Sequence, residues 1–263
     1  LLNLFKKNFL NYFYIIFLGA ISAYSLPPYN YFIINFFTFS LFFIFVFNKK
    51  KQTSENKPFF KYGWCFGFGY FLFSLYWIAI SLTFDQSFKF FIPVAIILLP
   101  AFLAIFYGLI LYLFSIFYSK NLVSSFLIFS ILFGVIEFVR GSILTGFPWN
   151  LISFSFSSSI YFIQILSFIG TYSFNLICVS LFTVPALFFL RNSKTEIIIC
   201  FCFILVSVGF LIFGYVKNHN FNSLESVKNS YTIKAISSNI SLDRFYSKQD
   251  ELKIINELIK LST

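Results

Sequence analysis

The feature that most constrains this chain is a series of long apolar runs, each near the roughly 20 residues that an α-helix needs to cross a bilayer. We expect about seven membrane-spanning helices from these runs. They cover residues 9–26, 29–47, 60–82, 90–118, 122–140, 160–190 and 196–216. The runs are continuous, whereas the strands of an outer-membrane barrel alternate between apolar and polar residues. The sequence therefore predicts an all-α polytopic membrane bundle.

Composition excludes the soluble alternatives. The chain is 59% hydrophobic and 11% charged, whereas soluble domains carry about 25% charged residues. A globule in water has too little polar surface to cover such an apolar excess. A soluble enzyme, a secreted disulfide scaffold and a disordered tail are therefore all excluded.

The basic residues predict the orientation of the bundle. The net charge of +10 does not indicate nucleic-acid binding, because the lysines and arginines are scattered between spans and not gathered on one face. They flank the N-terminus and every second connection, at Lys6, Lys7, Lys49, Lys50, Lys51, Lys57, Lys61, Lys120, Arg191 and Lys194. The opposite connections carry only Lys89 and Arg140, against Asp85. We therefore expect a cytoplasmic N-terminus and an external segment after Val216.

The first span also has a competing interpretation as a secretory signal peptide, since two lysines, an apolar stretch and Gly19-Ala20 follow one another. We favour a retained anchor, because the next span begins directly after Pro27-Pro28, where proline predicts a tight hairpin. The run at 160–190 is too long for one simple crossing. We expect it to be tilted or to extend beyond the membrane.

The composition changes after the last span. Residues 217–230 are polar and predict a linker after a membrane domain at 1–216. Residues 231–240 are rich in β-branched and aromatic side chains, which predicts a strand. Residues 247–250 are typical of a helix N-terminus, and apolar residues at helical spacing follow them. One strand and one helix cannot form a domain, so we expect 231–263 to be the start of a soluble α/β domain that is cut off.

Glu137 and Arg140 are the charged pair that the bilayer makes most costly. They lie three residues apart at the end of a span, on one face of a helix. Each charge costs roughly 2.5–3.5 kcal/mol at the centre of a bilayer. Two interpretations follow from the residues alone: a functional pair within the membrane, or a structural ion pair near the interface.

The residues after Arg140 predict a rigid turn at the outer membrane surface. Gly141 and Gly146 permit backbone bends, and Pro148 fixes one. Trp149 is typical of the membrane–water interface. These residues alone indicate an aromatic, re-entrant turn and no particular reaction.

The same stretch, E-x-x-R-G followed by T-G-F-P-W, resembles the signature of bacterial apolipoprotein N-acyltransferases. Other segments are similar to that family in the same order, at residues 18–28, 63–77, 100–108, 164–175 and 236–240. The sequence departs from the family pattern at Ser153, which replaces a usual Gly, and at Ser237 or Ser238, which replaces a common Gln.

The resemblance implies phospholipid-dependent N-acylation of the N-terminal diacylglyceryl-cysteine of apolipoproteins, a step of lipoprotein maturation. An acyl chain would pass from a phospholipid to a Cys thiolate as a thioester, and then to the α-amino group of the acceptor, so one difficult transfer becomes two easier steps. The implied partners are the phospholipid donor, the diacylglyceryl-modified apolipoprotein and the bilayer, with no cofactor. The implied location is the bacterial cytoplasmic (inner) membrane, with the C-terminal segment on the periplasmic side.

The resemblance also assigns roles to residues of this chain. It implies a structural signature made of Glu137, Arg140, Gly141, Gly146 and Pro148. Lipid-access positions are expected at Phe147 and Trp149, and at Phe245 and Tyr246, which stand where the family usually has Lys-Trp.

The resemblance implies a nitrilase-like domain in which Glu acts as general base, Lys stabilises the oxyanion and Cys is the nucleophile. We expect all three beyond Thr263, and because the chain starts at Leu1 without any Met, we interpret it as an inactive fragment. Its own cysteines do not fill the role: Cys65, Cys178, Cys200 and Cys202 lie in apolar spans, where we expect all four to be buried and the thiolate to be disfavoured. The C-x-C spacing is not one of a metal or redox site, and His219 is expected to be a solvated linker residue.

Two other classes of protein remain as alternatives. A small membrane transporter would show internal repeats and matching broken spans, and the sequence has no repeat of this kind. A non-catalytic membrane scaffold is the second alternative. Gly63-x-x-x-Gly67 permits close helix contact, and we favour packing within one bundle over dimerisation as its role.

Overall fold

The computed structural model describes residues 2–143, 146–223, 235 and 251–262. Every element in these ranges is helical, which confirms an all-α architecture there. The elements are α1 (Leu2–Ala23), α2 (Ile33–Gln52), α3 (Lys57–Leu75), η1 (Tyr76–Thr83), η2 (Gln86–Phe91), α4 (Ile92–Phe117), α5 (Leu122–Ser142), η3 (Ile152–Phe156), α6 (Ile160–Ile163), α7 (Leu166–Ile169), α8 (Thr171–Leu190), α9 (Lys194–Asn222) and α10 (Glu251–Ser262).

Six of the described helical segments are long and apolar enough to cross a membrane. They are Ile33–Gln52, Lys57–Thr83, Gln86–Phe117, Leu122–Ser142, Thr171–Leu190 and Lys194–Asn222. The first predicted span corresponds to a shorter apolar helix, Phe9–Ala23. By the length and composition of its helices, the chain is a multi-pass membrane protein.

The structure corrects two boundaries in the second half of the chain. The run at 160–190 is not one long helix, because Gly170 has a φ of 77° and ends the helical path. The crossing begins at Thr171, after the short helices α6 and α7. Helix α9 continues to Asn222 and so includes the start of the expected linker at 217–230. The expected strand at 231–240 lies outside the described residues, apart from residue 235.

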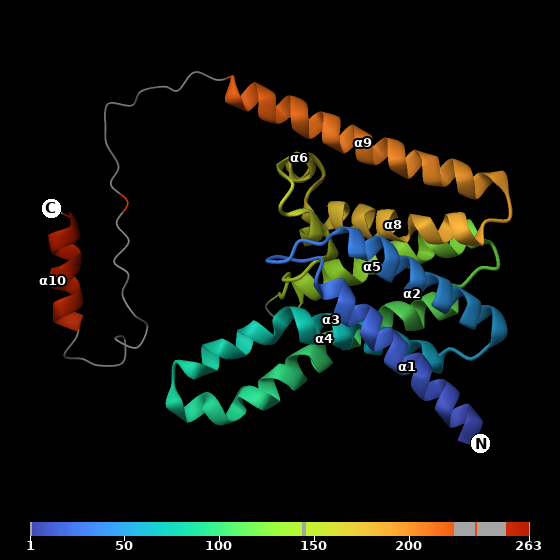
Figure 1. Ribbon diagram of the computed structural model, residues 1–263, viewed down its shortest axis with the longest axis horizontal. Coiled ribbons are helices and arrows are strands. Elements are labelled where there is room, and N and C mark those ends of the chain that lie inside the picture. Colours follow the sequence, from blue (N-terminus) through green and yellow to red (C-terminus); the bar gives the residue numbers. More distant parts are fainter. Residues whose placement is uncertain (1, 144–145, 224–234, 236–250, 263) are drawn as a thin grey trace.

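The bundle is organised around α3, which packs against α1 on one side and α4 on the other. Helix α2 packs against α1 and helix α5 against α4, and α8 packs against α2, α5 and α9 (Figure 1). The interior is filled by aromatic rings: Phe42 stacks on Phe66 with 4.1 Å between ring centroids, and Phe129 packs 4.8 Å from Phe133. Lipid tails are as apolar as these side chains, so dense packing rather than exclusion of water holds the helices together.

Close packing of α3 depends on glycines at its two interfaces. A Cβ atom at Gly63 would fall on the carbonyl oxygen of Tyr107 in α4, and one at Gly67 would lie 2.8 Å from the Tyr107 Cβ. On the other side, a Cβ at Gly69 would fall on the carbonyl oxygen of Ile16 in α1. The Gly63-x-x-x-Gly67 motif therefore packs within the bundle, as expected from the sequence.

The two ends of the bundle differ in charge. The α2–α3, α4–α5 and α8–α9 connections lie at the same end as the N-terminus, on the right in Figure 1. Lys49, Lys50 and Lys51 occupy the last turn of α2 at this end. The other end carries the α1–α2 hairpin, the projecting arm formed by η1 and η2, and the segment that follows α5. An eight-residue 3₁₀ helix such as η1 is unusually long, and such stretches often mark functional hinges.

We expect Gly63→Ala to destabilise the bundle by about 1–3 kcal/mol, because the new methyl group must push the α4 backbone away from α3. Gly209→Ala is the matched control: Gly209 lies inside α9 with no neighbouring atom within 4 Å of a new Cβ. Alanine there should be neutral or stabilising by about 0.5–1 kcal/mol. Thermal unfolding of both variants in one detergent checks the pair, and equal melting temperatures would contradict the packing role of Gly63.

Candidate functional site

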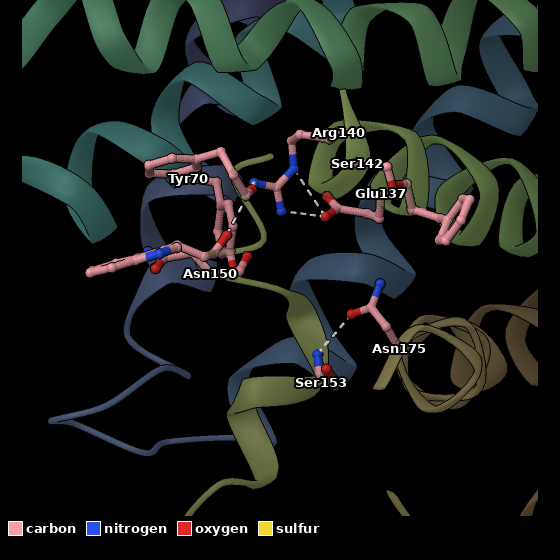
Figure 2. A network of polar contacts seen from close by, with 10 residues as sticks. Tyr70, Glu137, Arg140, Ser142, Asn150, Ser153 and Asn175 are labelled. Carbon is pink, nitrogen blue, oxygen red and sulfur yellow. Dashed lines mark hydrogen bonds and ion pairs between the residues drawn. The ribbon is translucent and has the colours of Figure 1, made fainter. Parts of the chain in front are cut away.

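The candidate site begins at the C-terminal end of α5, with a buried ion pair. Glu137 and Arg140 are each 1% exposed. The Arg140 Nη2 and Nε both donate to Oε2 of Glu137, and the Nε–Oε2 distance is 3.1 Å. Figure 2 shows the two side chains pointing toward each other. The ion pair expected from the spacing is therefore present. The second carboxylate oxygen, Oε1, has no hydrogen-bond partner among the described residues.

Arg140 also holds the chain that follows α5. Its Nη1 donates to the carbonyl oxygens of Phe147 (2.7 Å) and Trp149 (3.1 Å), and its guanidinium lies 5.3 Å from the centroid of the Phe71 ring. Only a planar guanidinium can serve a carboxylate and two carbonyls together in this way. The Arg140 side chain thus joins α5, α3 and the turn, and the contacts of its guanidinium described here are all with groups of the protein.

A second set of hydrogen bonds ties the turn to α3. The Tyr70 hydroxyl donates to the carbonyl oxygen of Asn150 over 3.0 Å, and the Asn150 side-chain amide donates to the carbonyl oxygen of Ser74 over 3.1 Å. Asn150 has a φ of 56°, a left-handed conformation that asparagine tolerates better than most residues. The turn is therefore fixed from both neighbouring helices, as Figure 2 shows.

The two glycines of the signature have different roles. Gly146 has a φ of 78°, so it bends the backbone as expected. Gly141 does not bend the chain, because it lies within α5. A Cβ atom at Gly141 would instead fall on the hydroxyl oxygen of Tyr172 in α8. The expected bend at Gly141 is wrong, and close approach of α8 is the reason that glycine fits there.

The turn forms one wall of a cavity of about 850 Å³ at the end of the bundle opposite the N-terminus. Its lining is mostly apolar, with a few polar groups: Leu26, Pro27, Pro28, Ser74, Trp77, Pro148, Trp149, Asn150, Leu151, Phe154, Ser157, Thr171 and Tyr172. A second cavity of about 430 Å³ shares Trp77 and Trp149 with the first and is also lined by Phe147. Both cavities have the apolar character and the size of small-molecule sites.

Stacked aromatic rings form the boundary that the two cavities share. The Trp149 ring lies 5.1 Å from that of Trp77 and 6.0 Å from that of Phe147, with interplanar angles of 26° and 22°. Trp77 and Trp149 are 41% and 48% exposed, so part of the surface of each residue is open to a ligand. The carbonyl groups that Arg140 binds thus belong to the residues whose rings line the cavities.

A buried polar network supports the floor of the larger cavity. The Asn35 amide in α2 donates to the hydroxyls of Ser25 (2.8 Å) and Ser155 (2.9 Å), and its Oδ1 accepts from Ser22 over 2.6 Å. These residues are fully buried. They join the α1–α2 hairpin, which carries Leu26 to Pro28, to the η3 segment. Asn35 was not predicted as a site residue, although a polar amide inside an apolar run is itself an unusual signal.

The structure places the remaining predicted site residues as follows. Pro148 lines the larger cavity, whereas Phe245 and Tyr246 lie outside the described residues. Cys65, Cys178 and Cys200 are buried, but Cys202 is exposed on α9, so the expected burial of all four cysteines is wrong. His219 is exposed near the end of α9, and the described residues contain no cluster suited to a metal ion.

Comparison with known proteins identifies the family. The model of the apolipoprotein N-acyltransferase N-terminal domain matches residues 18–184. This chain belongs to that family. Among curated apolipoprotein N-acyltransferases, that of Rhizobium etli is 36% identical over 66% of this chain and 34% of its own length. That of Agrobacterium fabrum is 30% identical over 93% of this chain and 46% of its length, and that of Rickettsia typhi 35% identical over 76% and 39%.

The matched region of the family model contains the ion pair, the turn and both stacked tryptophans. The chain spans between about a third and about half the length of the curated relatives it matches. Homology to apolipoprotein N-acyltransferases is therefore established for the membrane domain that holds the candidate site.

We expect Glu137→Leu to destabilise the protein by about 3–5 kcal/mol, because it leaves the buried Arg140 charge without its carboxylate. The double variant Glu137→Leu/Arg140→Met should be less destabilised than Glu137→Leu alone. It should not reach the parent stability, because the carbonyls of Phe147 and Trp149 lose their donor.

Thermal unfolding of the singles and the double in one detergent forms the required cycle. Ser142→Ala is the control, since Ser142 is exposed and its hydroxyl, among the described residues, bonds to the carbonyl of Phe138 in its own helix. A double variant that loses as much stability as the two singles combined would show that the two charges are not coupled.

Proposed function

We propose that this chain is the membrane domain of an enzyme that N-acylates the N-terminal diacylglyceryl-cysteine of apolipoproteins, with a phospholipid as acyl donor. The observation that carries the proposal is the amphipathic cavity behind Trp77 and Trp149, held open by Arg140 in a chain of this family. The proposed acyl-enzyme is a Cys thioester formed in a nitrilase-like domain that we place after the last span.

We propose that Phe147 and Trp149 form the lipid access of this enzyme. Their rings line the cavities at the end of the bundle where the outer interface would lie, and tryptophan favours that depth. The apolar walls suit an acyl chain, while the Asn150, Ser157 and Thr171 side chains supply polar groups for a headgroup. Holding the donor in this cavity would keep its acyl carbonyl in one place for attack.

Residues 231–263 are proposed to begin the nitrilase-like domain, after a linker that follows the end of α9 at Asn222. The amphipathic helix α10 supports this proposal, because Ile255 and Leu258 are exposed on it. An apolar stripe of this kind is normally buried against further elements of a folded domain.

We also propose that the N-terminus is cytoplasmic and that α9 ends on the periplasmic side of the inner membrane. The lysine-rich connections lie at the N-terminal end of the bundle, and Arg140 at the other end is neutralised by Glu137. Reporter fusions test this. Alkaline phosphatase should be inactive when fused after Lys51 and active when fused after Asn222, and activity after Lys51 would reverse the orientation.

The function is tested with the protein encoded by the complete reading frame, using labelled phospholipid and a diacylglyceryl-cysteinyl peptide. Trp149→Ala should reduce acyl transfer by about tenfold, because a stacked aromatic surface for the lipid is lost. Stability should change by less than about 1 kcal/mol, since Arg140 binds the Trp149 backbone and not its ring.

Phe168→Ala is the matched control, since Phe168 in α7 is also an exposed aromatic at this end but lines neither cavity. If Trp149→Ala instead loses much stability while its activity per folded molecule stays unchanged, the lipid-access proposal is wrong. The 263-residue chain alone should form no hydroxylamine-sensitive thioester, because Cys65, Cys178 and Cys200 are buried and Cys202 lies within an apolar span. Absence of acyl transfer by the complete enzyme would refute the function itself.

A further inference from the structure

A third large cavity lies at the opposite end of the bundle from the stacked tryptophans. It has a volume of about 780 Å³ and is formed by the end of α2, the α2–α3 connection and the end of α4. Its lining residues are Lys50, Lys51, Gln52, Thr53, Ser54, Asn56, Ser115, Ile116, Tyr118 and Lys120. No residue of this set belongs to the lipid access proposed above.

The lining carries three lysines and no carboxylate. Glu55 lies in the same connection but does not line the cavity. None of the three lysines that line the cavity forms an ion pair with a residue in the described part of the chain. The positive charge in the cavity is therefore not compensated by the described part of the protein.

The three lysines differ in what they do. Lys50 is half-buried and shapes the connection, because its ammonium donates to the Asn56 side-chain oxygen (2.7 Å) and the Ser54 carbonyl oxygen (3.1 Å). Lys51 and Lys120 are exposed. The Lys51 ammonium lies 5.0 Å from the Phe47 ring centroid, and neither lysine has a side-chain hydrogen bond to a described residue. These two ammonium groups are available to an anion.

A hydroxyl without a partner completes the polar wall. The Tyr118 ring packs 5.6 Å from that of Phe47, and its hydroxyl is buried without a hydrogen-bond partner in the described structure. Ser115, by contrast, uses its hydroxyl on the carbonyl of Tyr112. Buried polar groups are normally paired, and the Tyr118 hydroxyl keeps an unused donor beside the basic cavity.

The remaining wall is apolar and continues onto the lipid-facing surface. Ile116 lines the cavity and is 48% exposed, and its neighbour Phe117 is 60% exposed at the end of the α4 span. A ligand that fits both walls has an anionic head for the lysines and the tyrosine and an apolar chain for Ile116. Basic pockets between helices at a membrane surface bind lipid headgroups in this way.

We propose that this cavity binds the phosphate group of an anionic phospholipid, with the lipid chain lying along Ile116. The membrane orientation of the bundle would by itself explain lysines at this end. It would not explain why they line a cavity with an unpaired tyrosine hydroxyl beside it. The site is separate from acyl transfer, so it stands or falls independently of the proposed function.

The test measures binding of fluorescent phosphatidylglycerol to the whole chain in a neutral detergent. Lys51→Gln/Lys120→Gln should weaken binding by about thirtyfold, and Tyr118→Phe by about fivefold. Lys57→Gln/Lys61→Gln is the matched control, because it removes the same charge from exposed residues at the same end that do not line the cavity. It should weaken binding by less than about threefold.

Melting temperatures without lipid should match the parent for both lysine pairs, since all four lysines are exposed. Equal losses of binding in the two pairs would overturn the proposal in favour of general surface charge. Equally tight binding of phosphatidylcholine would overturn the requirement for an anionic lipid. Displacement of the lipid by glycerol 3-phosphate at the same concentration would assign the cavity to a free phosphate ester instead.

Discussion

The Arg140 guanidinium is the group on which the structure of the bundle end opposite the N-terminus depends. It is buried in a bundle whose surroundings are hydrocarbon, so its charge must be met inside the protein. Glu137 supplies the charge, and the carbonyls of Phe147 and Trp149 take the remaining donors. The hydrogen bonds that make burial of the arginine tolerable also fix the backbone of two aromatic residues that line the cavities.

The two ends of the bundle meet the membrane by different means. At the end that carries Arg140 the charge is paired and buried, and aromatic side chains are exposed there, with Trp77 and Trp149 stacked at 5.1 Å. At the other end the charge is exposed on lysines and surrounds a polar cavity. A lipid would therefore be held mainly by its chain at the first end and mainly by its headgroup at the second.

Local sequence signals predicted much of this arrangement. The apolar runs gave the helices, because span length depends only on composition along the chain. The spacing of Glu137 and Arg140 gave their ion pair, because residues three apart share a helix face. The break at Gly170 was missed because glycine within an apolar run is also compatible with a helix in a membrane, and hydropathy does not report φ.

The sequence by itself determined that this chain is a helical membrane protein of a known family, with an ion pair and an aromatic turn at one end. Only the tertiary structure decided what that turn faces. Trp77 comes from η1, directly after α3, and stacks on Trp149 of the turn, while Asn35 of α2 binds Ser155 of η3. Glycines let α3 pack closely against α1 and α4. Contacts between distant residues depend on how side chains fill space between helices, and no periodicity along one helix contains that information.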